Sequence, residues 1–216
     1  MSQQSTASET LSATQQVIPL IGCYVATSRM ELLENQLELA LNAGLTLSEA
    51  KEILVQLYAY CGFPRSLNAL GLLMKVTESR KQRGVQDDEG AEPSAPVPVG
   101  EALQRLGYEN QSIIAGGPVA GALFDFVPVI NQFLQSHLFG DIFARDNLDW
   151  QSRELATVGA LAATEGAESQ LLAHTRACLR VGLSTGQLYQ LVEVLRPVDN
   201  SAALRAEAAL HQASAA

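Results

Sequence analysis

The chain has 216 residues, of which 47% are hydrophobic and 17% are charged, and its formal net charge at pH 7 is −9. This length and hydrophobic content allow a sizeable folded core and exclude a largely disordered chain. The acidic balance and the lack of a basic stripe predict that the protein does not bind nucleic acid, because no cluster of cations is present to neutralise phosphates.

The N-terminal segment and the cysteines bear on the compartment. Residues 1–16 are polar and carry no secretory signal, and no apolar run of the chain approaches the ~20 residues that a membrane helix needs. Cys23, Cys61 and Cys178 are widely spaced, which favours free thiols in a reducing compartment over a disulfide framework or a zinc site. We therefore predict a cytoplasmic protein with no membrane contact, no bound metal and no cofactor.

A helical hairpin is predicted first along the chain. Ser28 and Glu31 have the spacing of a capping box, in which the two side chains satisfy each other's free backbone N–H groups. Gly44 supplies the left-handed end of this helix. Thr46 and Glu49 repeat the capping-box spacing and start the second helix of the hairpin.

The end of the second helix concentrates the chemically useful side chains. The sequence Gly62-Phe63-Pro64 predicts a sharp break, after which a third amphipathic helix begins. Around this break lie two tyrosines, a thiol, an arginine and an amide, namely Tyr58, Tyr60, Cys61, Arg65 and Asn68. Tyr58 and Tyr60 fall on different faces of a helix, so at most one of them is expected to share a pocket with Cys61.

The remaining chain also reads as helical. Residues 84–100 are rich in proline, glycine and acidic residues and predict a linker or an extended arm. An aromatic run over residues 121–139 predicts a helix that starts or kinks at Pro128. Further helices follow, one of them opened by Ser184, and a last one runs from about Asn200 to the C-terminus. Strand signals are nearly absent, so the predicted fold class is all-α.

An internal repeat is indicated when Gly44 is placed over Gly182. Residues 41–46 (LNAGLT) then align with residues 179–184 (LRVGLS), and leucine or isoleucine positions of the following helices also align. The shared pattern is a helix, a glycine stop, a hydroxyl cap and a second helix. Capping chemistry alone could produce part of it, but the added agreement of the core positions favours a duplication.

The motifs around both aligned glycines resemble those of the carboxymuconolactone decarboxylase family, which has the alkylhydroperoxidase D-like fold. The first motif runs from residue 41 to residue 64, with Glu52, Gln56, Tyr60, Gly62 and Pro64 at the characteristic spacing. The second is Arg153-Glu-Leu-Ala-Thr-Val-Gly-Ala-Leu161, followed by His174 and the turn at residues 179–184. Together they cover roughly residues 28–76 and 137–196.

The resemblance implies a helical bundle of two diverged repeats packed together, in an oligomer of two, three or six copies. The implied division is an N-terminal tail and short helix (1–27), a first repeat (28–80), a linker or extended arm (81–118) and a second repeat (119–216). A single family unit carries both the histidine helix and the Tyr-x-Gly-x-Pro turn. Because the turn lies in one half of this chain and His174 in the other, we expect a composite site.

The candidate catalytic residues are Cys61, His174, Glu52 and Tyr60. Cys61 is either a reactive thiol or a small buried core residue, and the peroxidase branch of the family would need a second cysteine where Pro64 stands. His174 is either a proton-transfer group or a satisfied core histidine. Glu52 lies off the apolar stripe, which predicts a solvated carboxylate; if it were buried, a raised pKa would make it a usable acid or base.

The candidate substrate-binding residues are Arg65, Asn68 and His137. Arg65 stands in the first turn of a helix, where a positive charge opposes the helix dipole, so a ligand carboxylate or a salt bridge to Glu49 or Glu52 would explain it. Asn68 follows on the same face and could add a hydrogen bond. His137 is a weaker candidate in the aromatic run.

By resemblance, the predicted function is cofactor-free decarboxylation, or related acid–base chemistry, on a small lactone or carboxylic acid. The alternatives are a single-cysteine alkylhydroperoxidase-like redox protein that uses Cys61, and a non-catalytic oligomeric scaffold. Decarboxylation would make the protein a lyase, and the redox chemistry would make it a peroxidase. Either activity would act on a small-molecule substrate.

Overall fold

The computed structural model describes residues 10–215, and within them the chain forms helices and no strand. The predicted all-α fold class is therefore confirmed. In chain order the elements are α1 (Ala13–Ala26), α2 (Met30–Asn42), α3 (Leu47–Gln56), α4 (Tyr58–Cys61), α5 (Phe63–Gln82), α6 (Glu101–Ala115), α7 (Ala122–Phe126), α8 (Pro128–Phe133), the π-helix η1 (Leu134–Ile142), α9 (Trp150–Ala162), α10 (Glu168–Arg180), α11 (Thr185–Leu195) and α12 (Asn200–Ser214). A span across a membrane would need a longer and more apolar helix than any of these.

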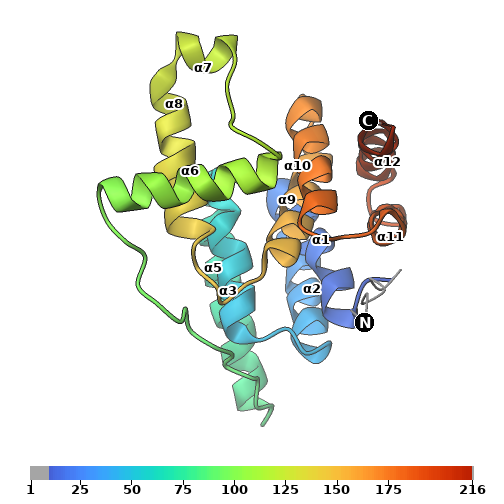
Figure 1. Ribbon diagram of the computed structural model, residues 1–216. Helices are drawn as coiled ribbons and strands as arrows, with labels where there is room; N and C mark the ends of the chain where they lie inside the picture. The colour runs from blue at the N-terminus through green and yellow to red at the C-terminus, as the bar shows by residue number, and fades with distance from the viewer. Residues whose placement is uncertain (1–9, 216) are drawn as a thin grey trace, which may run out of the picture.

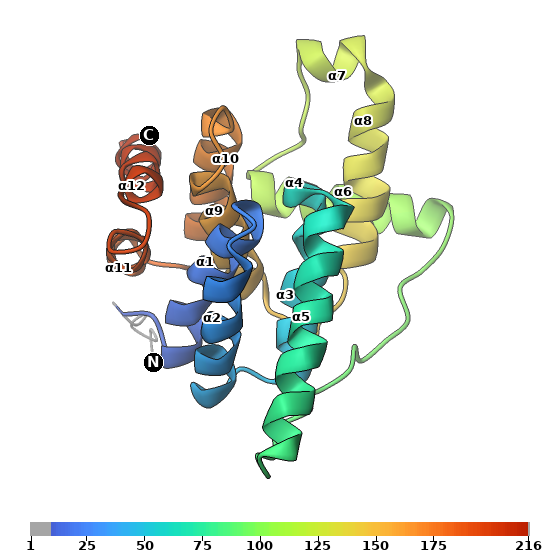
Figure 2. The ribbon, with the colours of Figure 1, turned by 180° about the vertical axis from the view of Figure 1, so that it is seen from behind.

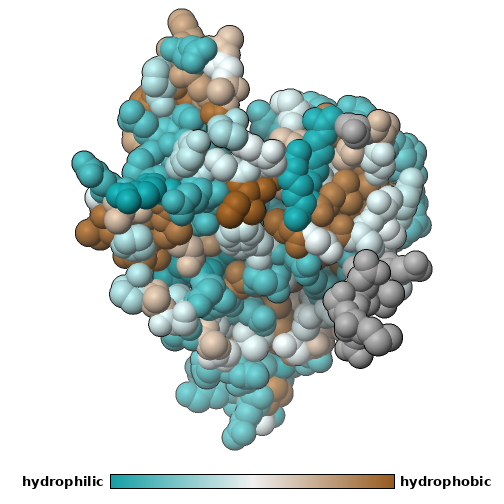
Figure 3. Space-filling model, viewed as in Figure 1, coloured by the Kyte–Doolittle hydropathy of each residue, from teal (hydrophilic) through white to brown (hydrophobic). Residues whose placement is uncertain are grey.

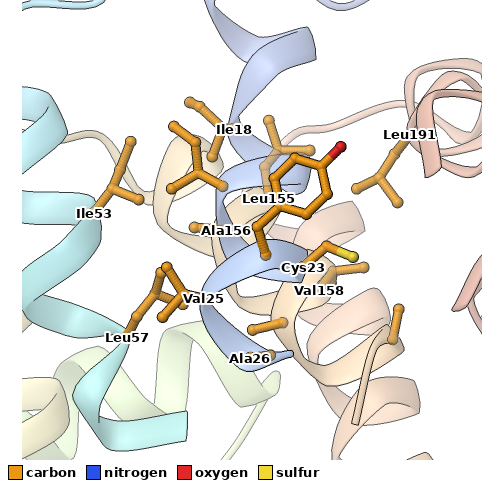
Figure 4. Packing of buried hydrophobic residues seen from close by; sticks show 14 of the residues in the cluster. Ile18, Cys23, Val25, Ala26, Ile53, Leu57, Leu155, Ala156, Val158 and Leu191 are labelled. Carbon is orange, nitrogen blue, oxygen red and sulfur yellow. The ribbon is translucent and has the colours of Figure 1, made fainter. Parts of the chain in front are cut away.

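Helix α1 lies at the centre of the fold (Figure 1) and packs along α9, with α2 and α11 beside it. For residues 1–27 the prediction was a tail with a short helix, whereas α1 has 14 residues, several of them buried. Residues 1–9 of the predicted tail lie outside the described part of the chain. Figure 4 shows Cys23 and Val25 of α1 packed with Leu155 and Val158 of α9. At the crossing a Cβ on Gly22 would collide with the backbone of α9, so only glycine allows this approach.

The two predicted capping boxes that match across the chain are both present. Thr46 accepts the N–H of Glu49 while the Glu49 carboxylate accepts the N–H of Thr46, and Ser184 and Gln187 do the same at α11. The glycines before them, Gly44 and Gly182, have φ angles of +96° and +99°. These short-range patterns determine local structure because their partners are three residues apart.

The capping box predicted at Ser28 is wrong. Helix α2 begins at Met30, and Ser28 itself has a φ of +56° in the turn between α1 and α2. The Ser28 hydroxyl accepts a hydrogen bond from Arg65 Nε at 3.1 Å. The Ser28 hydroxyl therefore bonds to α5 and does not cap the N-terminus of α2.

The break predicted at Gly62 is present, with a φ of +82°. It separates the single turn of α4 from α5, whose second residue is Pro64. A second interruption at Leu57, which the periodicity did not indicate, separates α3 from α4. The short helix α4 therefore presents Tyr58, Tyr60 and Cys61 on a turn bounded by two breaks.

Residues 84–100 form the predicted extended arm, which passes the start of α3 and leads from the end of α5 to α6 (Figure 2). The carbonyls of Asp88 and Glu89 accept the backbone N–H groups of Leu47 and Ser48, so this arm caps the start of α3. The rest of the predicted linker, 81–118, is different, because residues 101–115 form helix α6, which packs on η1.

Arg80 holds the extended arm to the helical body. Its guanidinium is buried and donates to both carboxylate oxygens of Asp87, to Glu38 at 2.6 Å and to Asn42 at 3.0 Å. Arg83, in contrast, is exposed, and its ion pair within residues 10–215 is with Glu38.

We expect Arg80→Met to lower the free energy of unfolding by about 2–3 kcal/mol, because it leaves the Asp87 carboxylate poorly solvated and unpaired. Urea denaturation would measure the change. Arg83→Met is the matched control and should cost less than about 1 kcal/mol, since exposed ion pairs stabilise little. Equal costs for the two variants would contradict a structural role for the buried guanidinium.

The aromatic run divides into α7, α8 and η1, and α8 begins at Pro128 as predicted. Residues 122–133, which we call the α7–α8 arm, stand out from the body in both ribbon views (Figures 1 and 2). Neither α7 nor α8 contains a buried residue. In the space-filling view this projection carries tan and brown residues among teal and white ones (Figure 3), so part of its exposed surface is apolar.

Candidate acid–base site

A buried carboxylate and a histidine form the centre of the candidate site. Glu154 lies on α9 and His174 on α10, and the His174 Nδ1 lies 2.7 Å from a Glu154 carboxylate oxygen. The Glu154 side chain is fully buried, whereas the His174 side chain keeps 15% of its surface exposed. Since a carboxylate only accepts hydrogen bonds, the shared proton is on Nδ1, and the other ring nitrogen, Nε2, is the one that can exchange a proton with a ligand.

Tyr60 brings the first half of the chain to this pair. Its ring meets the His174 ring edge-on, with 5.3 Å between centroids and 86° between the planes. Burial raises the pKa of Tyr60 far above its ordinary value, and the negative charge of Glu154 adds to this effect. The phenol is therefore a neutral hydrogen-bond group rather than a phenolate.

Two polar atoms of this cluster have no hydrogen-bond partner of good geometry within residues 10–215. They are the Tyr60 hydroxyl and the Glu154 oxygen that does not face His174, and both are buried. Unsatisfied buried polar atoms are costly, at about 1–3 kcal/mol each, and are uncommon without a functional reason. Thr157, one turn along α9 from Arg153, lies beside the phenol.

Glu52 is buried, so the prediction of a solvated carboxylate is wrong. Arg145 donates to both of its oxygens, at 2.8–3.1 Å, and Arg153 donates to one at 3.2 Å. Asn147 adds a further hydrogen bond at 3.2 Å. Arg153 is fully buried and also pairs with Gln56, so this network joins α3 to α9.

The charge state of Glu52 differs from the one expected for a buried acid. Burial alone would raise the pKa of Glu52, but the hydrogen bonds from Arg145 and Asn147 and the charge of Arg153 outweigh it and lower the pKa below its ordinary value. Glu52 is thus a carboxylate that neutralises arginines. This arrangement opposes a role as proton donor and favours a role in holding α9 against α3.

Cys61 is buried at the end of α4, next in the chain to Tyr60. Burial raises the pKa of its thiol to about 11, against the opposing charge of Arg65. Burial raises the pKa of Cys23 to about 11 and raises the pKa of Cys178 well above its ordinary value. All of these cysteines are free thiols, as the sequence predicted.

These pKa values predict unreactive thiols in the native protein. At pH 7 a thiol of pKa near 11 has roughly 300-fold less thiolate than an ordinary cysteine of pKa about 8.5, and only the thiolate attacks. Ellman's reagent should therefore label the folded chain slowly and all cysteines rapidly in guanidinium. Rapid native labelling of one thiol that disappears in Cys61→Ser would contradict this.

None of the predicted substrate-binding residues forms a hydrogen bond, ion pair or ring contact with Glu154 or His174 within residues 10–215. Arg65 forms no ion pair with Glu49 or Glu52, so that explanation is wrong; it is exposed and donates to Ser28 and, at 3.4 Å, to the carbonyl of Cys61. Asn68 is exposed and makes no hydrogen bond with any described residue.

His137 belongs to a separate aromatic group at the surface. Its Nδ1 lies 2.6 Å from Asp141, and its ring lies 5.6 Å from that of Tyr58, which in turn stacks on Phe63 at 4.2 Å. Tyr58 and Tyr60 thus face different neighbours, as the helical geometry predicted. His137 is not in the group formed by His174, Glu154 and Tyr60.

Glu154 is the site residue that sequence reasoning missed. It was part of the motif at residues 153–161, but no role was assigned to it. The available signal was a charged residue followed by an almost wholly apolar helix, Leu155–Ala163. Its partner His174 is 20 residues away on another helix, so no local spacing connects the two.

The fold and the site together define an all-α protein with a buried carboxylate–histidine pair on adjacent helices. Residues 128–215 match the model of the Carboxymuconolactone decarboxylase family. The resemblance inferred from the motifs is thus confirmed for the half of the chain that carries Glu154 and His174. A search of curated proteins found no match.

The match does not extend to the first half of the chain, so the tandem repeat is not confirmed. The two halves do share the local geometry of helix, left-handed glycine and capping box. That geometry follows from capping chemistry alone, and the duplication stays a prediction.

Proposed function

We propose that the protein is a carboxymuconolactone decarboxylase-like enzyme that catalyses cofactor-free proton transfer, or decarboxylation, on a small lactone acid or carboxylic acid. The observation that carries this proposal is the 2.7 Å contact between buried Glu154 and partly exposed His174. A buried carboxylate that orients an imidazole is the arrangement that general acid–base catalysis uses.

In the proposed reaction the carbon–carbon bond to the substrate carboxylate breaks and carbon dioxide leaves. The electron pair passes into the lactone carbonyl, which becomes an enolate. His174 Nε2 delivers a proton to the carbon that lost the carboxylate, while Glu154 holds Nδ1 and stabilises the charged ring. Tyr60 packs against the ring and is proposed to keep its orientation.

Arg65 is proposed to hold the substrate carboxylate, with Asn68 and His137 as further contacts. In support, the Arg65 guanidinium is exposed, pairs with no carboxylate among the described residues, and lies at the end of α4 beside the Cys61 carbonyl. A planar guanidinium binds carboxylates through two parallel hydrogen bonds.

The redox alternative has less support. A peroxidatic cysteine must be a thiolate, and the pKa of Cys61 is raised by burial to about 11. The proposed substrate is therefore a small acid rather than a hydroperoxide. We also propose that the protein acts in the cytoplasm as an assembly of identical copies; the free buried cysteines support a reducing compartment.

The test is turnover by the purified full chain. A panel of small carboxylated lactones would be incubated with the protein in D₂O, with carbon dioxide release and deuterium incorporation followed by NMR. We expect deuterium at the carbon that loses the carboxylate, and equal rates for the wild type and Cys61→Ser.

Two outcomes would overturn the proposal. Reduction of an alkyl hydroperoxide that is lost in Cys61→Ser would establish the redox alternative. The absence of turnover of any lactone acid or hydroperoxide by the folded protein would favour the scaffold.

A further inference from the structure

The extended arm, residues 84–100, is held to the helical body by hydrogen bonds rather than by buried apolar side chains. None of its residues is buried. Two of its backbone carbonyls accept the N–H groups of Leu47 and Ser48, and the carbonyl of Ala91 accepts the Ser48 hydroxyl at 2.6 Å. A segment with few buried apolar contacts and exposed hydrogen bonds opens at a low cost in free energy, because water replaces the bonds that it loses.

The two ends of the arm are fixed more firmly than its middle. At one end the Asp87 carboxylate pairs with the buried guanidinium of Arg80 at 2.7 Å. At the other end the chain enters α6 after Gly100, whose φ of +64° permits the change of direction. Figure 2 shows the arm without helical structure between α5 and α6, so residues 88–99 can lift from α3 while both ends stay in place.

The docked position of the arm on α3 is a defined one. Gly90 has a φ of +74°, and a Cβ at this position would collide with the side chain of Thr46 at the start of α3. The Asp88 carboxylate accepts the N–H of Gly90 at 2.9 Å and fixes this turn of the arm. The close approach requires glycine, so the arm fits α3 in one specific position.

The arm also holds the loop formed by residues 145–147, which we call loop 145–147. The backbone N–H of Ser94 donates to the Asp146 carboxylate at 2.8 Å, and the Ser94 hydroxyl donates to the same carboxylate. On the other side the Ser48 hydroxyl, which donates to the arm, accepts a hydrogen bond from Asn147 at 3.0 Å. The arm therefore contacts the loop both directly and through α3.

Loop 145–147 carries two of the groups that neutralise the buried Glu52 carboxylate. Arg145 and Asn147 both donate to it, and the third donor is Arg153 of α9. Arg153 directly precedes Glu154, the carboxylate of the candidate acid–base pair. A continuous series of hydrogen bonds thus leads from the arm, through the loop and Glu52, to the helix that carries Glu154.

We propose that the extended arm is a strap that opens and closes as one unit, and that its closed state holds loop 145–147 on Glu52 and thereby keeps α3 and α9 in the arrangement that the candidate site needs. When the strap opens, the bonds to Ser48 and Asp146 pass to water, and the loop is free to leave Glu52. The contact between Tyr60, which follows α3, and His174 then loosens. An ordered segment that is released as a unit is a common form of switch. Its effect on turnover rests on the proposed function, whereas the opening itself does not.

Charge holds the strap closed and makes the switch sensitive to salt. Residues 84–100 carry four acidic side chains, Asp87, Asp88, Glu89 and Glu92, and no basic one. Glu92 lies close enough to Arg145 for its charge to act on that guanidinium. Salt screens exposed charges over about 10 Å at 0.1 M and about 3 Å at 1 M. We therefore expect the open fraction to rise with ionic strength.

The first test is amide hydrogen exchange of the full chain, resolved by NMR. Asp146→Ala removes the acceptor of both Ser94 bonds and touches neither Leu47 nor Ser48. If the strap opens as a unit, the amides of Leu47 and Ser48 should nevertheless exchange about tenfold faster, the effect of losing one or two hydrogen bonds. Ser169→Ala, which removes an exposed hydroxyl bond on α10, is the matched control and should change neither rate. Faster exchange at Ser94 alone, or at no site, would overturn the proposal.

The second test locks the strap. The double variant Ser94→Cys/Asp146→Cys lacks both bonds when reduced and is closed by a disulfide when oxidised, and the oxidised wild type controls for the buried native thiols. Oxidation should slow exchange at Leu47 and Ser48 by about tenfold or more. It should also return the fluorescence of Trp150, the single tryptophan, whose indole donates to the Phe143 carbonyl beside the loop, to the wild-type spectrum.

The ring-proton shifts of Tyr60 and His174 report whether the strap reaches the candidate site. We expect them to differ between the reduced and oxidised double variant, with the oxidised form matching the wild type. Identical shifts in the two forms, or no cross-link between the two cysteines, would overturn the proposal. These readouts need no substrate, so a wild type without turnover would contradict the proposed function and leave the result for the strap intact.

Discussion

Replacing Glu52 with glutamine should lower the free energy of unfolding by about 3–5 kcal/mol, which is the usual cost of breaking a buried ion pair from one side. The substitution keeps the shape of the side chain but removes the charge that faces Arg145 and Arg153. Arg153 is fully buried and would then be a cation without a counter-charge between α3 and α9. Chemical denaturation of the two proteins would measure the difference.

A surface ion pair provides the control for this variant. Glu193 also faces an arginine, Arg196, at 3.0 Å, but its side chain is 65% exposed. Glu193→Gln should therefore cost less than about 1 kcal/mol. A cost of the same small size for Glu52→Gln would show that water reaches the buried network and screens it.

The same network should make stability depend on pH. The pKa of Glu52 is lowered in the folded protein from its ordinary value of 4.5, so the unfolded chain takes up this proton first as the pH falls. The stabilisation by ionised Glu52 is complete above about pH 4.5 and is lost as the pH falls through the folded-state pKa of Glu52. The difference between the wild type and Glu52→Gln should accordingly shrink as the pH falls below about 4.5, and a difference that stays constant as the solution is acidified would contradict the assignment.

Replacing His174 with glutamine should lower kcat/KM on any lactone acid that the protein turns over by about 10²–10⁴-fold, the usual contribution of a general acid or base. Glutamine can hydrogen-bond to Glu154 but cannot transfer a proton at neutral pH. Glu154→Gln should show a loss of similar kind, since the amide can accept the Nδ1 hydrogen bond but cannot stabilise a charged ring. Steady-state kinetics at several pH values would measure both.

Two further variants separate catalysis from structure. Cys61→Ser should keep full activity, because its thiol is a protonated core group in this proposal. His137→Gln should affect binding at most, since His137 lies in the aromatic group with Tyr58 rather than beside Glu154. Full activity of His174→Gln in a folded protein would remove His174 from the proposed mechanism.

Several features could be predicted from the sequence because they depend on neighbours only a few residues away. The capping boxes at Thr46 and Ser184 formed as their spacing indicated, and the glycine at position 62 interrupted the helix. Helix α6 lies within the predicted linker, 81–118, although the sequence contains a signal for it. Its apolar and small residues Leu103, Leu106, Gly107 and Ile114 recur on one helical face.

The errors occurred where a distant contact outweighed a local pattern. Ser28 had the right spacing for a cap, but α5 brings Arg65 to its hydroxyl. Glu52 lies off the apolar stripe of its helix, but it is buried because Arg145 and Arg153 pair with its carboxylate. Neither contact can be predicted from the sequence around Ser28 or Glu52 alone, because the arginines belong to other parts of the chain.

The sequence by itself therefore determined the class of fold, the positions of the glycine and capping signals and the resemblance to a family, since periodicity and hydrogen bonding within a few residues specify helices and their ends. Only the tertiary structure decided that Glu154 meets His174, that Tyr60 covers this pair and that Cys61 is a buried thiol. These properties depend on which helices pack together, and it is packing that brings residues far apart in the chain within hydrogen-bonding distance and removes water from around them.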